Sequence, residues 1–293
     1  MRLVSMLPSA TEIVYALGLA DQLVGVTFEC DEPATARTEK AIVVGGRDTR
    51  GMSPGEIDAY VRERTAAGED LYTLHAGAMA ELDPDLILTQ DLCRVCALPS
   101  GTVQEALDHL GCRADVLSLD PHTLDDVLDT IVQVGLRTGT ADRATRLVAG
   151  LRDRLAAVAA AVSGRPRPRV AVVEWVDPPF TAGHWVPDLV VAAGGRAVSA
   201  RPGRPSGPTT WAEIAAEEPD VVVVAPCGYH LDGAAEQARA VADRLPGRPV
   251  WAIDGDGLVV RPGPRLVEGV AALAAILHPG AVPAAPGSVR RIA

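Results

Sequence analysis

Residues Thr123 to Ser163 read TLDDVLDTIVQVGLRTGTADRATRLVAGLRDRLAAVAAAVS. Apolar residues recur with helical spacing through most of this stretch. They are Leu124, Val127, Leu128, Ile131, Val134, Leu147, Leu151 and Leu155. Pro121 precedes the stretch and the proline-rich residues 164–168 follow it, as is typical of the two ends of a helical segment. The spacing predicts one long helix, and the alternative is two helices broken between Gly135 and Gly139.

Short apolar runs rich in β-branched residues lie on both sides of this helical segment. They are Leu3–Ser5, Leu23–Val26, Ala41–Val44, Asp85–Thr89, Ala114–Leu117, Arg169–Trp175, Arg196–Ser199, Asp220–Ala225 and Pro249–Ile253. Strands that alternate with helices predict parallel sheets. We therefore expect an α/β protein with two Rossmann-like lobes, residues 1–120 and 165–293. The long helix within residues 121–164 would join them, with a ligand cleft between the lobes.

Composition and charge exclude several classes of protein. Lys and Arg number 27 against 38 Asp and Glu, a net charge of −11, and no basic run is long enough to follow a phosphate backbone. Nucleic acid is therefore not an expected partner.

The apolar residues at the start of the sequence end at Pro8, and Glu12 follows, which does not fit a signal peptide. A cytoplasmic location is predicted, or a periplasmic or cell-surface one if a leader was trimmed or the start misassigned. No apolar run is long enough for membrane insertion.

Loops that follow strands are the places to search for a site, because open α/β sheets bind ligands at the carboxyl ends of their strands. Four of the five cysteines fall on such loops: Cys30, Cys93, Cys96 and Cys227. Thiolates at this spacing bind zinc or an iron–sulfur cluster. The alternatives are that these cysteines pack as small apolar residues, or that Cys93 and Cys96 form a redox pair. Cys112 precedes a predicted strand and is interpreted as structural.

Aromatic side chains are scarce, at 3% of the chain, so their positions carry information. Four of them fall on strand ends or loops of the second lobe, where flat rings stack on a planar ligand: Trp175, Trp185, Trp211 and Tyr229. Trp185 is the best candidate because a neighbouring glycine lets its loop approach a ligand. Trp251 and Trp175 are interpreted as core residues.

Polar residues on the same loops complete the set of candidates. His184 is a candidate axial ligand of cobalt or iron. Ser9 and Thr11 precede a helix predicted to begin near Glu12, where backbone N–H groups favour an anionic group, although N-capping explains them equally. Glu29 and Asp31 add carboxylates.

The sequence contains no catalytic acid–base pair and no known catalytic motif, so no enzymatic activity is expected.

Six short segments, in this order, resemble one family. They are Ser5-Met6-Leu7-Pro8-Ser9-Ala10-Thr11-Glu12, Leu82-Asp83-Pro84-Asp85-Leu86-Ile87, Trp185-Val186-Pro187-Asp188, Ala193-Gly194-Gly195, Glu218-Pro219-Asp220-Val221 and Arg261-Pro262-Gly263-Pro264-Arg265. Together they resemble the substrate-binding proteins of ABC importers for cobalamin and iron chelates, whose two lobes are joined by a rigid helix. The resemblance implies that the first loop and the aromatic residues of both lobes hold a large planar ligand.

The resemblance also implies a Glu on each lobe that pairs with Arg of an ABC permease. In the vitamin-binding relatives it lies seven residues before the Pro of a Pro-Asp pair. Those positions hold Gly77 and Ala212 here, so permease docking is not expected unless Glu81 and Glu213 serve in a shifted register.

Two hypotheses follow for the function. The first is a binding protein for a corrinoid such as cobalamin, or an iron chelate. The second is a cytosolic metalloprotein that holds an iron–sulfur cluster or zinc through the four loop cysteines.

Overall fold

The computed structural model describes residues 1–49, 51–92, 99–110 and 113–293. The chain divides into two compact units. The first comprises residues 1–120 and 129–147, and the second comprises residues 121–128 and 148–293. The division falls within two helices, α6 (Leu124–Arg137) and α7 (Ala141–Val162), so each helix belongs in part to both units.

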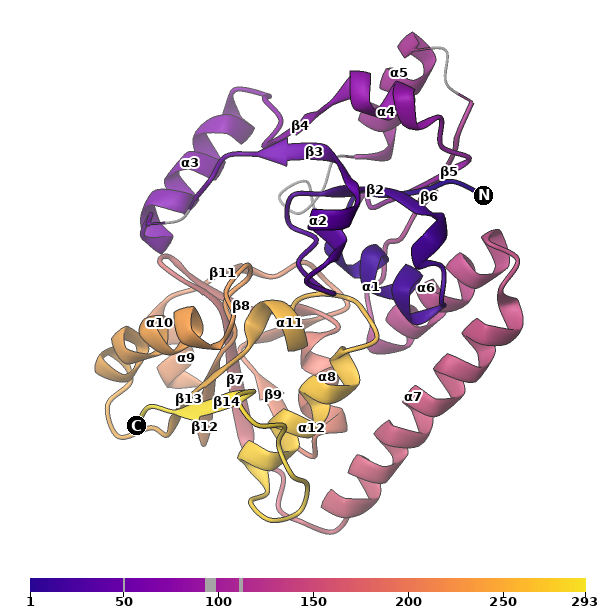
Figure 1. The fold of residues 1–293 in the computed structure, drawn as a ribbon. Helices are drawn as coiled ribbons and strands as arrows, with labels where there is room; N and C mark the ends of the chain where they lie inside the picture. The colour runs from indigo at the N-terminus through magenta and orange to yellow at the C-terminus, as the bar shows by residue number, and fades with distance from the viewer. Residues whose placement is uncertain (50, 93–98, 111–112) are drawn as a thin grey trace. The chain divides into compact units, whose positions relative to one another are not determined.

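The first unit is built on a six-stranded sheet of order β4-β3-β2-β1-β5-β6 (Figure 1). Its strands are β1 (Leu3–Ser5), β2 (Leu23–Thr27), β3 (Ala41–Gly46), β4 (Tyr72–Leu74), β5 (Leu86–Thr89) and β6 (Asp115–Ser118). Neighbouring strands are parallel, except that β4 runs antiparallel to β3. The chain passes from β1 to one side of the sheet and returns to the other side at β5. The carboxyl end of β1 is thus the switch point, where open α/β sheets bind ligands.

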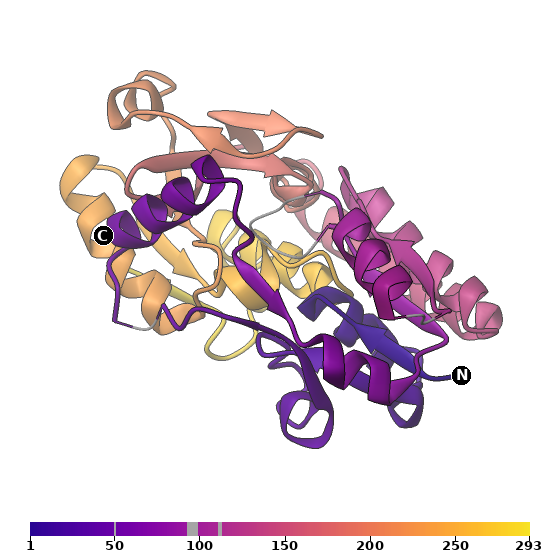
Figure 2. The same cartoon turned by 90° about the horizontal axis from the view of Figure 1, so that it is seen from above.

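The connections of the first unit are mostly helical. They are α1 (Pro8–Ala16), the short 3₁₀ turn η1 (Ala20–Gln22), α2 (Ala36–Glu39), α3 (Pro54–Ala66), α4 (Ala76–Leu82) and α5 (Ser100–Leu110). Val4 of β1 and Ile87 of β5 are fully buried, and they share a core with Val103 and Leu107 of α5. The N-terminus leads directly into β1, as both views show (Figures 1 and 2).

The second unit contains an eight-stranded sheet with the central order β10-β8-β7-β12-β13-β14. Its strands are β7 (Arg169–Val176), β8 (Pro179–His184), β9 (Arg196–Val198), β10 (Ala200–Pro202), β11 (Gly207–Pro208), β12 (Val221–Val224), β13 (Val250–Ile253) and β14 (Val289–Arg291). Strands β7, β12 and β13 are parallel, whereas β8 and β14 are antiparallel to their neighbours β7 and β13.

The helices of the second unit cover this sheet. They are α8 (Val186–Ala192), α9 (Trp211–Ala216), α10 (Leu231–Arg244), α11 (Gly255–Leu258) and α12 (Leu266–Leu277). Val222 and Val224 of β12 are 0% exposed, and they pack with Ala234, Ala238 and Val241 of α10. No helix in the described ranges is long and apolar enough to cross a membrane.

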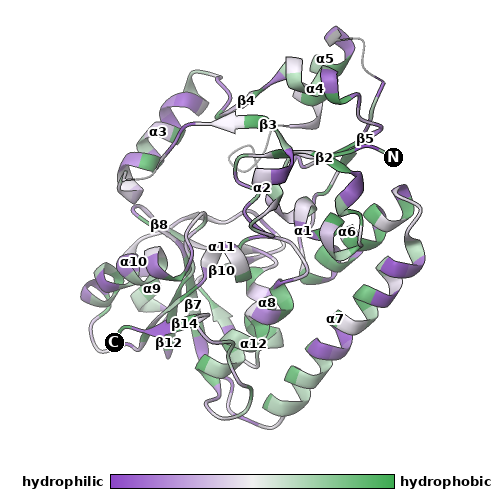
Figure 3. Ribbon diagram, viewed as in Figure 1, coloured by the Kyte–Doolittle hydropathy of each residue, from purple (hydrophilic) through white to green (hydrophobic). Residues whose placement is uncertain are grey.

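The long helical segment is two helices, so the prediction of a single helix was wrong. The chain turns at Gly139, whose φ of +70° lies in the left-handed region that glycine adopts readily. A Cβ at Gly135 would lie 2.4 Å from the Cβ of Ala144, so the glycine allows α6 and α7 to approach closely at this corner. Helix α7 is amphipathic: buried Ala144, Val148 and Leu151 lie on one face, and Figure 3 shows apolar and polar patches alternating along it.

Candidate functional site

Three parallel strands of the second unit end at one edge of the sheet. Val173 of β7 pairs with Val224 of β12, which in turn pairs with Ala252 of β13. Backbone hydrogen bonds tie the following loops together: Cys227 N donates to the Glu174 carbonyl at 3.1 Å. The residues just beyond these strands are therefore held side by side at the carboxyl-terminal edge, and we call them the second-unit edge. It comprises Trp175, Cys227, Tyr229, His230, Asp254, Asp256 and Arg261.

Two aromatic rings pack against each other at this edge. The ring centroids of Trp175 and Tyr229 are 6.0 Å apart with an interplanar angle of 55°, a geometry typical of favourable aromatic pairs. Trp175 Nε1 donates to the Asp177 carbonyl at 3.0 Å, which orients the indole. A Cβ at Gly233 would lie 2.6 Å from the Tyr229 ring, so the glycine makes room for it. Sequence reasoning assigned Trp175 to the core, but its side chain is only half-buried.

The Tyr229 hydroxyl stays protonated at neutral pH. Burial raises the pKa of Tyr229, and the nearby Glu236 carboxylate raises it further. The side chain is therefore a neutral aromatic surface with a hydrogen-bond donor, as suits contact with a polar macrocycle.

His230 and Asp254 form a polar pair at the same edge. His230 Nδ1 lies 3.0 Å from Asp254 Oδ1, and Gly257 N donates to the same oxygen at 2.9 Å. Asp254 is thus the N-cap of α11 and also orients the imidazole. Burial raises the Asp254 pKa, but the hydrogen bonds from His230 and Gly257 and the charge of Arg265 outweigh it, so the pKa lies below its ordinary value.

Replacing Asp254 with Ala is expected to lower the free energy of unfolding of the second unit by about 1–2 kcal/mol at neutral pH. The cap of α11 and the partner of His230 are both lost. Because the folded pKa lies below the unfolded one, the carboxylate stabilises the fold fully above the unfolded value of about 3.9. This stabilisation disappears as the pH falls through the folded value.

Urea unfolding followed by tryptophan fluorescence measures this effect, since all four tryptophans lie in the second unit. The difference between wild type and Asp254→Ala should shrink below about pH 4. A difference that stays constant from neutral pH to about pH 3 would contradict the role of the carboxylate.

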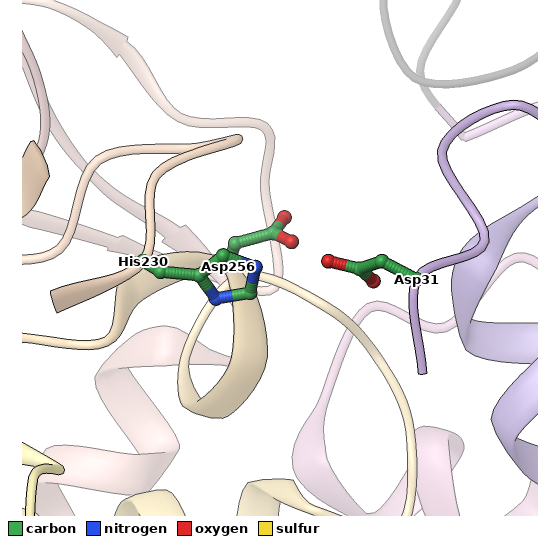
Figure 4. A group of neighbouring side chains, drawn as sticks. All are labelled: Asp31, His230 and Asp256. Carbon is green, nitrogen blue, oxygen red and sulfur yellow. The ribbon is translucent and has the colours of Figure 1, made fainter. Parts of the chain in front are cut away.

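An ion pair between buried Arg261 and half-buried Asp256 completes the second-unit edge. Arg261 is 6% exposed and donates to the carboxylate of Asp256. The backbone N–H of Asp256 donates to the Tyr229 carbonyl at 3.1 Å, which links this pair to the aromatic residues. Figure 4 shows the His230 imidazole and the Asp256 carboxylate, whose ligand atoms lie within 4.8 Å of each other. In the sequence, Arg261 was noted only as part of a motif, and neither Arg261 nor Asp256 was predicted to be functional.

In the first unit, Ser9 and Thr11 lie inside α1, which begins at Pro8 rather than near Glu12. Both side chains are buried, at 3% and 0% exposed. The expectation that they precede the helix is therefore wrong.

The Cys30 sulfur, 0% exposed, lies 3.0 Å from Thr11 Oγ1 and 3.5 Å from Thr27 Oγ1. Thr11 Oγ1 is also 2.9 Å from Ser5 Oγ. Cys30 thus packs among hydroxyl groups within the first unit.

The loop after β5 is anchored at both ends by carboxylates. Asp120 Oδ1 accepts hydrogen bonds from the backbone N–H groups of Asp91 and Leu92, at 2.6 and 2.8 Å. Asp91 Oδ1 in turn accepts from Ser100 N at 2.8 Å, where α5 begins. Asp91 and Ser100 therefore belong to one hydrogen-bond network with Asp120.

Cys93 and Cys96, like Cys112, lie outside the described residues. Cys227 is exposed at the second-unit edge, whereas Cys30 belongs to the first unit. Neither unit, within its described residues, gathers three Cys, His, Asp or Glu ligand atoms at one point. The four-cysteine centre thus stays a prediction from the sequence.

The remaining candidates of the first unit follow β2. Tyr72 donates to the Glu29 carboxylate, with oxygens 3.2 and 3.4 Å away, and its ring packs against Phe28. Asp31 lies two residues further on and is half-buried.

Strand β8 places two candidates, His184 and Trp185, differently from the expectation. It runs antiparallel to β7, so its carboxyl end, with His184 and Trp185, lies away from the hairpin turn that follows Trp175. Trp185 is 5% exposed and its Nε1 donates to the Val259 carbonyl at 2.9 Å, as a core residue does. A Cβ at Gly183 would lie 2.2 Å from Ser206 N, so this glycine accommodates backbone rather than a ligand.

Trp211 occupies the first position of α9, directly after the N-cap Thr210. Its side chain is partly buried and packs against the core of the second unit. The structure thus brings together Tyr229 and Trp175, for which core packing was the favoured interpretation, but it gives Trp185 and Trp211 packing contacts.

Two α/β units with polar and aromatic side chains beyond parallel strands define a ligand-binding architecture. The family model described as "Periplasmic binding protein" matches residues 3–253. The chain belongs to this periplasmic binding protein family, which confirms the resemblance inferred from the sequence motifs.

Individual relatives agree with this assignment. The chain is 27% identical over 288 residues to the cobalamin-binding protein of Halobacterium salinarum, covering 94% of this chain and 69% of that protein. The periplasmic heme-binding protein of Pseudomonas aeruginosa has a TM-score of 0.71 and 24% identity, covering 100% and 98% of the two chains. The periplasmic vitamin B12-binding protein of Vibrio cholerae has a TM-score of 0.64 and 22% identity, covering 94% and 98%. These structures share the two-lobed α/β fold.

Proposed function

We propose that this chain binds a planar metal macrocycle, a corrinoid such as cobalamin or a heme, at the second-unit edge. The aromatic pair of Trp175 and Tyr229 is the observation that carries the proposal. A flat ring system bound there covers the half-buried indole and phenol and gains both apolar contact and stacking. The related proteins named for cobalamin, vitamin B12 and heme support this class of ligand.

Polar groups around the rings suit the periphery of such a ligand. The propionates of a heme are anionic, and the amide side chains of a corrinoid donate and accept hydrogen bonds. Arg261, Asp256 and His230 offer matching groups beside Tyr229. Pre-oriented polar groups of this kind determine which ligand is selected.

Titration of the purified protein with cyanocobalamin and, separately, with hemin tests the proposal. Binding quenches the fluorescence of tryptophans in the second unit, and calorimetry gives the stoichiometry. We expect one equivalent of one of these ligands to bind with a Kd of about 1 μM or tighter. Binding of hemin alone would assign an iron chelate, and binding of cobalamin alone a corrinoid. Failure of both ligands to bind would overturn the proposal.

The expectation that this chain does not dock on an ABC permease stays a prediction, as does the cytoplasmic location. Gly77 and Ala212 occupy the positions where the vitamin-binding relatives carry docking carboxylates. The alternative of an iron–sulfur or zinc protein is not favoured, because Cys30 is enclosed by Thr11 and Thr27 in the first unit.

A further inference from the structure

We propose that His122 and His184 together bind one divalent transition-metal ion of the Zn²⁺ type. Both residues belong to the second unit. Their ring centroids are 6.0 Å apart and the ring planes are inclined by 40°. Zn–N bonds measure about 2.0–2.1 Å, so two imidazoles that share one ion have centroids roughly 5–6 Å apart. The observed separation lies at the upper end of this range.

The His184 imidazole carries an unused ligand atom. Its Nε2 is buried and has no hydrogen-bond partner among the residues that the structure describes. A buried polar atom without a partner destabilises a fold, and such atoms call for an explanation, an unseen ion among them. An imidazole nitrogen that carries no proton presents the lone pair that a metal ion needs.

The backbone holds His184 in an unusual conformation. Its φ is +46°, in the left-handed region that a residue with a side chain seldom adopts. Two backbone hydrogen bonds keep it there: His184 N donates to the Arg204 carbonyl at 2.6 Å, and Gly203 N donates to the His184 carbonyl at 3.0 Å. The ring also stacks on Trp185, with centroids 5.5 Å apart. Strain of this kind is typical of functional sites.

His122 is held beside His184 by neighbouring contacts. The Asp126 carboxylate accepts hydrogen bonds from the backbone N–H groups of His122 and Thr123, at 3.0 and 2.8 Å. Asp188, in the first turn of α8, accepts from Leu124 N at 3.0 Å and so ties the start of α8 to the start of α6. Both histidines thus stand on segments that are bonded to each other. His122 is exposed, which leaves the outer side of the pair open to ions and to the waters that complete the coordination shell.

Competition with a chromophoric chelator measures Zn²⁺ binding, and the visible absorption of Co²⁺ reports nitrogen ligation. Wild-type protein without an affinity tag should bind one equivalent. His122→Ala and His184→Gln should each weaken Zn²⁺ binding by at least tenfold. The affinity of the double variant for Zn²⁺ should be no lower than that of the single variant that binds more weakly. His109→Ala and His75→Ala serve as controls, because neither residue belongs to the pair, and both should bind as wild type does. Binding should also weaken as the pH falls, because protons compete for the imidazoles.

Unchanged Zn²⁺ affinity in His122→Ala would overturn the inference. His122 is exposed and lies outside a helix, so this variant is expected to fold, and circular dichroism checks that it does. The inference does not depend on the proposed macrocycle. Titration of His122→Ala with cyanocobalamin or hemin should give wild-type affinity, so a failure of the metal site and a failure of the macrocycle proposal are distinguishable.

Discussion

Replacing Trp175 with Ala is expected to weaken binding of the macrocycle by about tenfold to hundredfold. The indole is half-buried at the end of β7 and packs against Tyr229. Removing it deletes one of the two flat surfaces and leaves the Tyr229 ring without its neighbour. Calorimetric titration with cyanocobalamin or hemin measures the loss.

Two conservative variants separate stacking from folding. Trp175→Phe keeps an aromatic ring and should stay within about threefold of the wild-type Kd, because the Nε1 bond to Asp177 orients the ring but does not itself stack. Trp251→Phe changes a tryptophan in the middle of β13 and should bind as wild type does. Equal affinities for wild type and Trp175→Ala would place the ligand elsewhere.

Replacing Trp185 with Ala is expected to destabilise the second unit by about 3–5 kcal/mol. This indole is 5% exposed and bonded through Nε1 to the Val259 carbonyl. Its removal leaves a large cavity and a carbonyl without its donor. Urea unfolding followed by the fluorescence of the remaining tryptophans measures the change, since all of them report on the second unit.

Trp185→Phe is the matched control. It loses the hydrogen bond but keeps most of the apolar volume, so it should recover a substantial part of the stability. A loss below about 1 kcal/mol in Trp185→Ala would be inconsistent with a packed core tryptophan. The two alanine variants together test the reassignment of these tryptophans: one should lose ligand, and the other should lose stability.

Every strand expected from an apolar run is present within two residues of its predicted bounds. The apolar runs that predict strands are most continuous where a strand is covered on both faces, as in Val221-Val222-Val223-Val224. Strands β4, β8, β10, β11 and β14 were missed. The two-residue β11 contains a glycine and a proline, and β8 begins with Pro179, so their pairing depends on neighbouring strands rather than on local preference.

The candidate site was predicted only in part, and β8 explains much of the difference. Side chains that follow parallel strands gather at one edge of a sheet, and the predicted site depends on that arrangement. Strand β8 instead runs antiparallel to β7 and carries His184 and Trp185 away from the turn that joins β7 to β8. Trp175 was missed because apolar and β-branched neighbours make it look like a core residue. Its exposure arises because β7 extends beyond the end of β12, and the register of those strands cannot be seen in the sequence.

The helical segment from Thr123 to Ser163 separates what the sequence determines from what the tertiary structure decides. The sequence by itself determined that residues 123–163 are helical, that αβ units lie on both sides and that the chain resembles the periplasmic binding proteins. These are local patterns of apolar spacing and short motifs, and each is encoded by residues close together in the chain. Only the tertiary structure decided that the segment turns at Gly139, where Gly135 and Ala144 meet. Such contacts depend on how closely two helices can pack, and that depends on the rest of the fold.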